Sequence, residues 1–477
     1  MLFNSINYIF VFLPIVFIGY FLLNKYNLYK SSKFFLLLAS LYFYGTYKWS
    51  YVYIIICSIA FNYLITILFK KDLKDNYRKF ILSFGILGNI LILFFFKYFN
   101  FVSEFFANTP WHHLSAFHVI MPLGISFFTL QQISYLVDCY NKKIAQNNII
   151  DYSLFICFFP QLIAGPIVRH SEMIPQFNNL KNKKINQDNI FIGIFILTIG
   201  LLKKTVFADG FTYFIDYNIE HEVFTDFYIS WFLGICKMMQ LYFDFSGYCD
   251  MAIGSAFLFN ISLPWNFNSP FRVQSITDYW KRWNMTLIRF LHEYVYKPLG
   301  GNKINEFRTN INIIIMLLTM GLWSGIYINN ILYGLINGIL ICINRFWEKL
   351  NIKMNKILAT VLTFISLVIP VQFIIIKDFS ASIALIKSMF GAALTFKAIH
   401  IHGLNFVFSP LPPFSVRLNI ILFISSLCVI FFFKNSNQLA KMYVKANNIF
   451  YTYILAIVFV FAALSITKSS DFIYFIF

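Results

Sequence analysis

Long apolar runs recur along almost the whole chain, and they restrict its possible folds more than any other feature. Of the 477 residues, 59% are hydrophobic and 12% are charged. A soluble core could not hide this much apolar surface, and a helix that crosses a membrane needs about 20 mostly apolar residues. We therefore expect an all-α polytopic membrane protein, with one integral-membrane domain over residues 1–477 and about 11–13 membrane segments.

Most of the apolar runs have the length of one crossing. The predicted crossings are Tyr8–Leu23, Phe34–Tyr47, Tyr51–Phe69, Phe80–Phe96, Val119–Val137, Ile190–Ala208, Leu358–Ile376, Leu418–Phe433 and Phe450–Ile466. Two further runs are long enough for two segments each. We expect Phe227–Phe259 to bend around Gly247 and Ile311–Ile343 to bend around Gly325.

The run Leu154–Val168 differs from the others because Pro160, Gly165 and Pro166 interrupt it. Proline removes a backbone donor and breaks a helix, and non-helical backbone at membrane depth is tolerated where protein buries it or where it lines a cavity. We therefore predict a re-entrant or broken segment here, and not a simple crossing.

The net charge of +18 is distributed in short basic gaps between the apolar runs. Cytoplasmic loops carry an excess of Lys and Arg, so these gaps should face the cytoplasm, with both termini outside. The run at Met1–Leu23 lacks the features of a cleaved signal, so we expect it to remain as the first span. No soluble basic face is predicted, which excludes a nucleic-acid partner and leaves the lipid bilayer, including anionic lipid, as the natural partner.

The seven cysteines are scattered singly, without the spacing of a metal site. We expect them to be packing residues, and we predict no metal site.

Residues 275–301 concentrate charges, amides and tryptophans in the middle of this apolar chain. Polar groups between membrane segments are costly and are usually functional. This segment is therefore the first candidate for a functional site, and the alternative is a solvated cytoplasmic loop.

Several blocks of sequence follow one another in order along the chain. They are Met1–Ser5, Pro122–Thr129, Ser134–Asp138, Phe158–Pro166, Gly200–Lys204 with Ala208 and Asp209, Tyr242–Tyr248 and Ser275–Gly301. In order and spacing these blocks resemble those of the membrane-bound O-acyltransferase family. The likeness is greatest to the bacterial branch with alginate O-acetylases, peptidoglycan O-acetyltransferases and the teichoic-acid D-alanylation protein. A polysaccharide flippase or polymerase would share the apolar composition but would predict none of these blocks.

The resemblance implies a ring of tilted helices around a central tunnel in a bacterial cytoplasmic (inner) membrane. It implies an acyl thioester donor, acetyl-CoA or an acyl-carrier protein, that is used as a substrate, so no bound cofactor is expected. The acceptor would be a cell-envelope or exported polysaccharide, and a periplasmic or extracellular acyltransferase partner would complete the transfer. The family uses a histidine in the tunnel, and imidazole suits general-base or nucleophilic help at neutral pH.

This chain departs from the family pattern at the catalytic blocks. Where the bacterial branch has Trp-His-Met-Thr-Leu, this chain has Trp283 followed by Asn284, and where the family has Gly-Leu-Trp-His-Gly, it has Trp323 followed by Ser324. Where the family often has a further His-Gly, this chain has Asn337 and Gly338. The catalytic candidates by resemblance are therefore Asn284 and Ser324.

Two explanations of Ser324 remain open. Because a serine hydroxyl is not a base at neutral pH, the simplest one is a weakened or lost transferase that acts as a binding or scaffold component of an envelope-modification complex. Alternatively, His292 supplies the imidazole. Asn284 and His292 are eight residues apart and would share a face only in a continuous helix.

Other polar and aromatic residues are expected to line the tunnel and bind substrate. They are Gln161, Asp244, Ser246, Trp283, Glu293, Trp323 and Asn337. For Gln161 the alternative is a structural bend.

Overall fold

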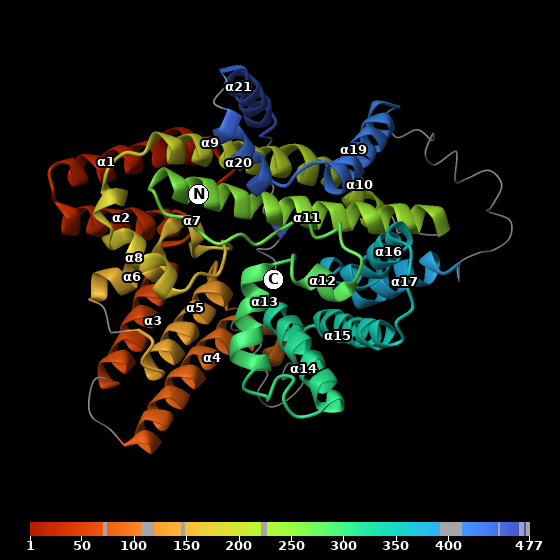
Figure 1. Ribbon diagram of the computed structural model, residues 1–477, viewed down its shortest axis with the longest axis horizontal. Coiled ribbons are helices and arrows are strands. Elements are labelled where there is room, and N and C mark those ends of the chain that lie inside the picture. The colour runs from red at the N-terminus through yellow and green to blue at the C-terminus, as the bar shows by residue number, and fades with distance from the viewer. Residues whose placement is uncertain are drawn as a thin grey trace. The chain divides into compact units, whose positions relative to one another are not determined.

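The computed structural model describes residues 1–69, 74–105, 119–144, 148–220, 227–391, 413–446, 449–466 and 472–473, and it shows only helices and connecting segments over these residues (Figure 1). The chain forms two compact units. The first unit contains residues 1–198, 248–265 and 442–455, and the second contains residues 199–247, 266–441 and 456–477. The predicted all-α fold is confirmed.

The helices that begin in the first unit include segments that overlap the predicted apolar runs. They are η1 (Asn7–Phe12), α1 (Leu13–Lys25), α2 (Tyr29–Gly45), α3 (Trp49–Leu68), α4 (Asp75–Phe105), α5 (Ile125–Tyr140), α6 (Ile149–Cys157), α7 (Phe159–Leu162), α8 (His170–Asn178), η3 (Leu180–Lys183), α9 (Gln187–Leu202) and α21 (Ile449–Leu464).

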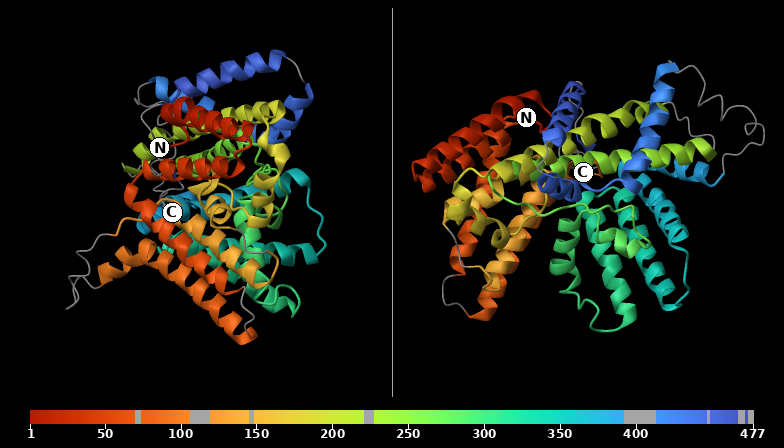
Figure 2. Two further views of the ribbon diagram at one scale, coloured as in Figure 1. Left: turned by 90° about the vertical axis from the view of Figure 1, so that its left-hand side faces the viewer. Right: turned by 45° about the horizontal axis from the view of Figure 1, so that its top comes forward.

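The helices that begin in the second unit include the segments around the predicted site. They are η4 (Lys203–Ala208), α10 (Asp209–Glu220), α11 (Phe227–Leu258), α12 (Ile276–Trp280), α13 (Met285–Leu291), η5 (His292–Tyr296), α14 (Glu306–Ser324), α15 (Ile328–Lys349), α16 (Lys356–Ile375), α17 (Phe379–Met389), α19 (Pro413–Phe432) and α20 (Ser436–Ala446). Figure 2 shows the same helices from two further directions.

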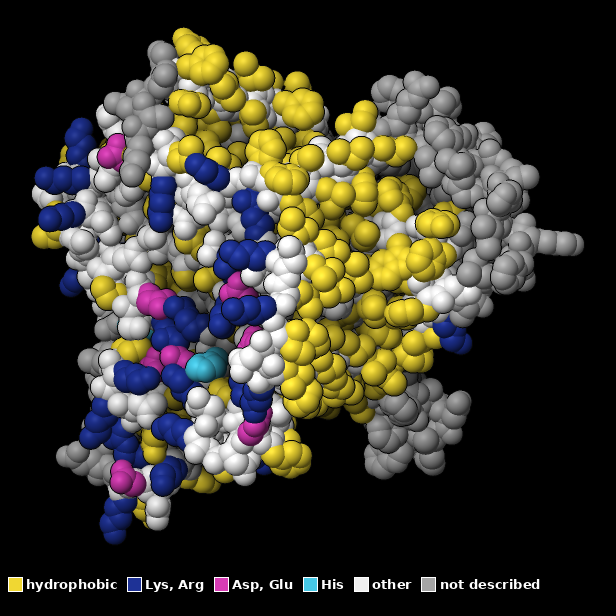
Figure 3. All heavy atoms as spheres, turned by 45° about the vertical axis from the view of Figure 1, so that its right-hand side comes forward, with side chains coloured by type: hydrophobic (Ala, Val, Ile, Leu, Met, Phe, Trp, Pro, Cys, Tyr) yellow, Lys and Arg dark blue, Asp and Glu magenta, His cyan; other side chains and the backbone are white. Residues whose placement is uncertain are grey.

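The membrane character of the protein is visible in its helices and on its surface. Among the described residues, 5 helices are long and apolar enough to cross a membrane, and a pair bent by 69° between α19 and α20 could add a sixth. Figure 3 shows hydrophobic side chains over a broad area of one face, with Lys and Arg side chains gathered in a separate area. A soluble monomer rarely exposes so large an apolar patch, so this is a multi-pass membrane protein. The count of 11–13 segments remains a prediction.

The predicted break in the run 154–168 is present. Helix α6 ends at Cys157, Phe158 leaves the helical conformation, and α7 holds only four residues with a proline in its first turn. The backbone then continues without a helix to Arg169. The freed backbone is bonded within the first unit, where the amide of Ala164 donates to the hydroxyl of Tyr248 at 3.3 Å.

The prediction for Phe227–Phe259 was wrong. Helix α11 runs unbroken through Gly247 for 32 residues. A Cβ atom at Gly247 would lie only 2.8 Å from the carbonyl oxygen of Gly200, so this glycine allows a close backbone approach and does not bend the helix. The other prediction is confirmed, because α14 ends and α15 begins on either side of Gly325.

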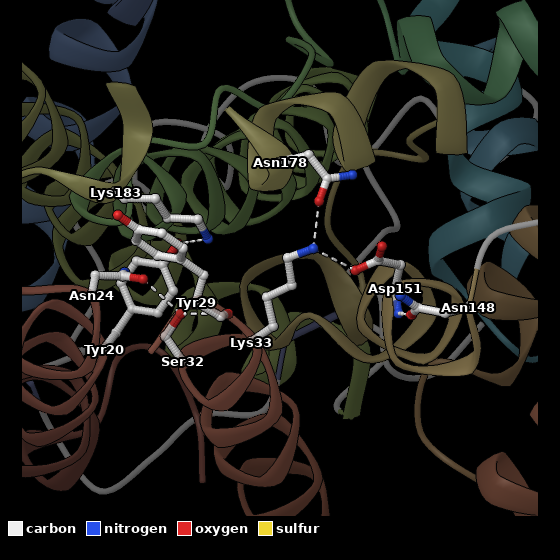
Figure 4. A network of polar contacts seen from close by, with 9 residues as sticks. All are labelled: Tyr20, Asn24, Tyr29, Ser32, Lys33, Asn148, Asp151, Asn178 and Lys183. Atoms are coloured by element: carbon white, nitrogen blue, oxygen red, sulfur yellow. Dashed lines mark hydrogen bonds and ion pairs between the residues drawn. The ribbon is translucent and has the colours of Figure 1, made fainter. Parts of the chain in front are cut away.

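Polar contacts tie the N-terminal helices to the rest of the first unit (Figure 4). The ammonium of Lys33 on α2 lies 2.7 Å from a carboxylate oxygen of Asp151 on α6 and also donates to Asn178 on α8. The ammonium of Lys183 donates to the hydroxyl of Tyr20 on α1 at 3.2 Å. Helices α1, α2, α6 and α8 and the short η3 are therefore fixed to one another.

Candidate functional site

The polar segment predicted from sequence folds into the short helices α12 and α13 of the second unit, and α13 continues directly into η5. Helix α12 begins after Ser275, whose hydroxyl accepts a hydrogen bond from the amide of Asp278 at 3.1 Å. It ends at Trp280, and the chain passes through Trp283 to Asn284 before α13 begins. Serine at the position before a helix is a preferred cap, so this start is encoded locally.

Asn284 occupies the turn between these helices. It is buried and has φ 42° and ψ 52°, in the left-handed region that asparagine tolerates better than most residues. Asn266 holds the next turn in place: its carbonyl oxygen accepts from the amide of Met285 at 3.0 Å, and its side-chain oxygen accepts from the hydroxyl of Thr286 at 2.6 Å. The helix therefore begins after Asn284, and Asn284 itself is buried inside the protein.

Helices α13 and η5 form a hairpin with α14 (Figure 1). Near its first turns, α14 is held to the connecting loop, because the amide of Asn312 donates to the carbonyl oxygens of Leu299 and Gly301 at 3.2 and 2.9 Å. Since the two arms run in opposite directions, Asn284 at the start of α13 and Ser324 at the end of α14 lie at the same end of the hairpin. The structure thus brings the two catalytic candidates to one end.

His292 lies nearer the loop of this hairpin. At a rise of 1.5 Å per residue, eight helical positions displace it by about 12 Å from Asn284 along the helix. Its side chain is exposed and stacks on Tyr296, with ring centroids 5.2 Å apart. Glu293, predicted to line the tunnel, lies 4.0 Å from Lys297 in a partly exposed ion pair. These positions do not favour His292 as the replacement imidazole, and the role of both residues remains a prediction.

Ser324 and Asn337 are both buried and both bonded to their own helices. The hydroxyl of Ser324 donates to the carbonyl oxygen of Met320 at 3.1 Å, and the amide of Asn337 donates to that of Tyr333 at 2.8 Å. Among the described residues, neither the side-chain oxygen of Asn337 nor the indole nitrogen of Trp280 on the adjacent α12 has a hydrogen-bond partner. Buried polar atoms are nearly always bonded, so these two atoms call for a water molecule or a ligand.

Helices α14 and α15 approach each other very closely near Ser324. A Cβ atom at Gly321 would lie 2.2 Å from the carbonyl oxygen of Asn330, and one at Gly334 would lie 2.4 Å from that of Leu317. Small residues permit such backbone contact between membrane helices. The glycines therefore position the end of α14, with Ser324, against α15.

The two predicted tryptophans are buried. The ring of Trp283 stacks on Tyr279, with centroids 5.5 Å apart, and meets the edge of Phe267 at 5.0 Å. Trp323 is 7% exposed and directly precedes Ser324. Aromatic packing of this kind makes the end of the hairpin rigid. Whether either ring contacts substrate remains a prediction.

Asp244 is held by a buried ion pair that the sequence did not reveal. The ammonium of Lys204 lies 2.7 Å from Asp244 and 2.9 Å from Asp209. The backbone amide of Ile473, near the end of the chain, donates to Asp244 at 2.8 Å, and the ring of Phe472 lies 4.5 Å from the ammonium. Asp244 is therefore compensated and immobilised, which suits an anchoring role better than that of a base.

Ser246 lies on α11 two residues beyond Asp244, and its buried hydroxyl has no hydrogen-bond partner in the part of the chain that the structure describes. Such a hydroxyl is compatible with the predicted contact with substrate.

Gln161 belongs to the first unit, in the short helix α7. Its amide donates to the carbonyl oxygen of Phe155 at 2.6 Å, while its side-chain oxygen has no hydrogen-bond partner over the residues described. Its role in lining the tunnel remains a prediction. Nearby in sequence, His170 is buried against Tyr135 and Phe155, and this burial lowers the pKa of His170 to about 4. Its imidazole is therefore neutral at physiological pH.

No group of three or more His, Cys, Asp or Glu side chains that could hold a metal ion occurs over the residues that the structure describes. The polar groups of these candidate residues are the amides of Asn284 and Asn337, the hydroxyl of Ser324 and the indole of Trp280. They can bind and orient an uncharged polar substrate through hydrogen bonds, but they are weak proton acceptors.

Comparison with known proteins identifies the fold. The model of the membrane-bound O-acyltransferase family matches residues 140–377. The chain is 40% identical over 424 residues to the peptidoglycan O-acetyltransferase of Helicobacter pylori, covering 82% of this chain and 80% of that protein. It is 32% identical over 415 residues to a probable alginate O-acetylase of Pseudomonas syringae pv. tomato, and the match covers 85% of this chain and 77% of that protein.

A more distant relative is the teichoic acid D-alanyltransferase of Bacillus subtilis. It is 29% identical over 304 residues, which cover 60% of this chain and 75% of that protein. These relatives fall within the bacterial branch that the sequence blocks predicted. The matched region contains the broken segment, the buried Lys204–Asp244 pair and the hairpin with Asn284 and Ser324. The chain belongs to the membrane-bound O-acyltransferase family.

Proposed function

We propose that this protein transfers an acetyl group, or another short acyl group, from a cytoplasmic thioester to a polysaccharide of the cell envelope. The observation that carries the proposal is its 40% identity, over most of both chains, to a peptidoglycan O-acetyltransferase. The donor would be acetyl-CoA or an acyl-carrier protein, and a periplasmic or extracellular partner would complete the transfer. The protein would act in the bacterial inner membrane with both termini outside.

The reacting groups would meet at the end of the α13–α14 hairpin. This placement is supported by the buried positions of Asn284 and Ser324. The amides would orient the acceptor hydroxyl and the thioester carbonyl. Without an imidazole at Ser324 the acceptor would lose its base, and general-base catalysis contributes about 10²–10⁴-fold, so we expect slow transfer.

A second candidate function is a binding or scaffold component of an envelope-modification complex. It is favoured by the hydroxyl of Ser324, which is bonded to the carbonyl oxygen of Met320 within its own helix. It is favoured too by His292, which is exposed and lies toward the other end of the hairpin. In this role the tunnel would bind an acyl group or a glycan without transferring it.

One experiment separates the two functions. A deletion strain would be complemented with the wild-type chain or with the His292→Ala variant, and ester-linked acyl groups would be measured on the purified envelope polysaccharide. The enzyme proposal predicts more ester in both complemented strains than in the deletion strain. Equal ester in all strains, at matched membrane levels of the protein, would favour the scaffold. Loss of ester with His292→Ala alone would reinstate His292 as the catalytic imidazole.

A further inference from the structure

A cavity of about 240 Å³ lies in the second unit, where α19 ends and α20 begins. Its walls are mostly apolar and come from segments far apart in the sequence, including Phe207, Tyr242, Phe271, Val429 and Leu439. Pockets that enclose a whole drug-sized ligand are larger, about 300–1,000 Å³. This cavity therefore has the size for a compact head group and the start of an apolar chain.

Hydrogen bonds keep the walls of this cavity in place. The guanidinium of Arg272 donates to the carbonyl oxygen of Ile430 at 2.9 Å and to that of Phe433, so it satisfies the last carbonyls of α19. The amide of Asn435 donates to the side-chain oxygens of Asn268 and Ser269 at 2.9 and 3.2 Å. Because the break between the helices is bonded from both sides, the cavity is a built feature and not a packing defect.

The polar part of the lining is cationic. Lys203 donates from its ammonium to the hydroxyl of Ser436 at 2.9 Å, and this ammonium lies 5.9 Å from the ring centre of Tyr242. Lys434 also lines the cavity, and none of the described lining residues is Asp or Glu. Two ammonium groups and a hydroxyl beside apolar walls suit a ligand that carries a phosphate next to an acyl chain.

We propose that this cavity binds the phosphate head group of an anionic phospholipid, with the start of an acyl chain against the apolar wall. Lys203 is partly buried at the cavity, and Lys434 is exposed at the same opening. The phosphate would accept hydrogen bonds from both ammonium groups, while the apolar walls would exclude water and strengthen the attraction. The described residues that line the cavity lie outside the α13–α14 hairpin, and two of them, Tyr242 and Phe271, pack against Trp283 with ring centroids 6.1 and 6.2 Å away. Lipid binding at the cavity does not depend on acyl transfer.

The test is lipid retention by the purified full-length protein, followed by native mass spectrometry with phosphatidylglycerol and phosphatidylcholine of identical acyl chains. The variants are Lys203→Met and Lys434→Gln. Lys441→Gln is the matched control, because Lys441 is exposed on α20, seven residues after Lys434, but is not among the residues that line the cavity. Since Lys434 is also exposed, Lys434→Gln should fold even if Lys203→Met does not.

The wild type should retain phosphatidylglycerol in preference to phosphatidylcholine. Each cavity substitution should lower that preference about fivefold, as expected for one lysine at an anionic head group, and Lys441→Gln should leave it unchanged. Equal retention of the two lipids by the wild type would overturn the proposal, and so would an equal effect of Lys434→Gln and Lys441→Gln. Displacement of the lipid by inorganic phosphate alone would assign the site to free phosphate and would overturn the lipid proposal.

Discussion

Replacing Lys204 by methionine should destabilise the protein strongly, because it leaves two carboxylates without their cation. The side chains of Lys204 and Asp244 are 2% and 1% exposed, and the ammonium is within 3 Å of Asp244 and Asp209. Removing one partner of a buried ion pair typically costs about 3–5 kcal/mol, since the other charge stays buried. The side chain of Asp209 is more exposed, at 15%, so most of the loss in stability should come from the buried carboxylate of Asp244.

The assay is equilibrium unfolding of the purified protein in mixed detergent micelles. Asp244→Asn should cost less than Lys204→Met, because the ammonium keeps its contact with Asp209 at 2.9 Å. The double variant should recover part of the loss, since it removes both buried charges. Asp278→Asn is the control, because its pair with Arg282 is about one-third exposed and should be worth about 1 kcal/mol or less. A loss for Lys204→Met no larger than that of the control would refute this reasoning.

Two further predictions concern acid stability and helix packing. His170 has an ordinary pKa of 6.5 and a folded pKa of about 4, so the unfolded chain binds the proton first as the pH falls. Neutral His170 therefore contributes about 3 kcal/mol to the free energy of unfolding above pH 6.5, and this contribution should be lost as the pH falls to about 4. His170→Gln should not show this loss when unfolding is measured at neutral pH and near pH 4. The same loss in the wild type and the variant would contradict the prediction. Gly334→Ala should cost about 1–3 kcal/mol, measured by the same unfolding assay, because its Cβ would lie 2.4 Å from a backbone oxygen. Gly338→Ala, where the nearest atom is at 3.1 Å, is the control and should cost less.

The positions of the helices could be predicted from sequence because membrane insertion depends on local composition. Apolar runs marked α1, α3 and α16 to within a few residues, and the prolines marked the break after α6. The error at Gly247 has a different cause. Its glycine is needed for contact with Gly200, a residue far away in sequence, and nothing local distinguishes that role from a bend.

The site could be predicted only in part, because some of its contacts join residues that are far apart in the sequence. The polar segment and the family blocks pointed to Asn284 and Ser324, which the fold brings to one end of a hairpin. The partner of Asp244 was not predicted, because the ion pair joins residues 40 positions apart and depends on how α11 packs. Lys204 and Asp244 both lie in blocks that resemble the family. Two opposite charges within apolar runs were the sequence feature that could have indicated a buried ion pair.

The most direct test of the proposed site is to restore the family imidazole with Ser324→His and to measure ester-linked acyl groups on the envelope polysaccharide of the complemented deletion strain. Thr319→His, on the same helix but outside the site, is the matched control. Since general-base catalysis contributes about 10²–10⁴-fold, Ser324→His should raise the ester content well above that of the wild type, and Thr319→His should not. No increase at equal protein levels, or the same increase with Thr319→His, would contradict acyl transfer at the end of the α13–α14 hairpin.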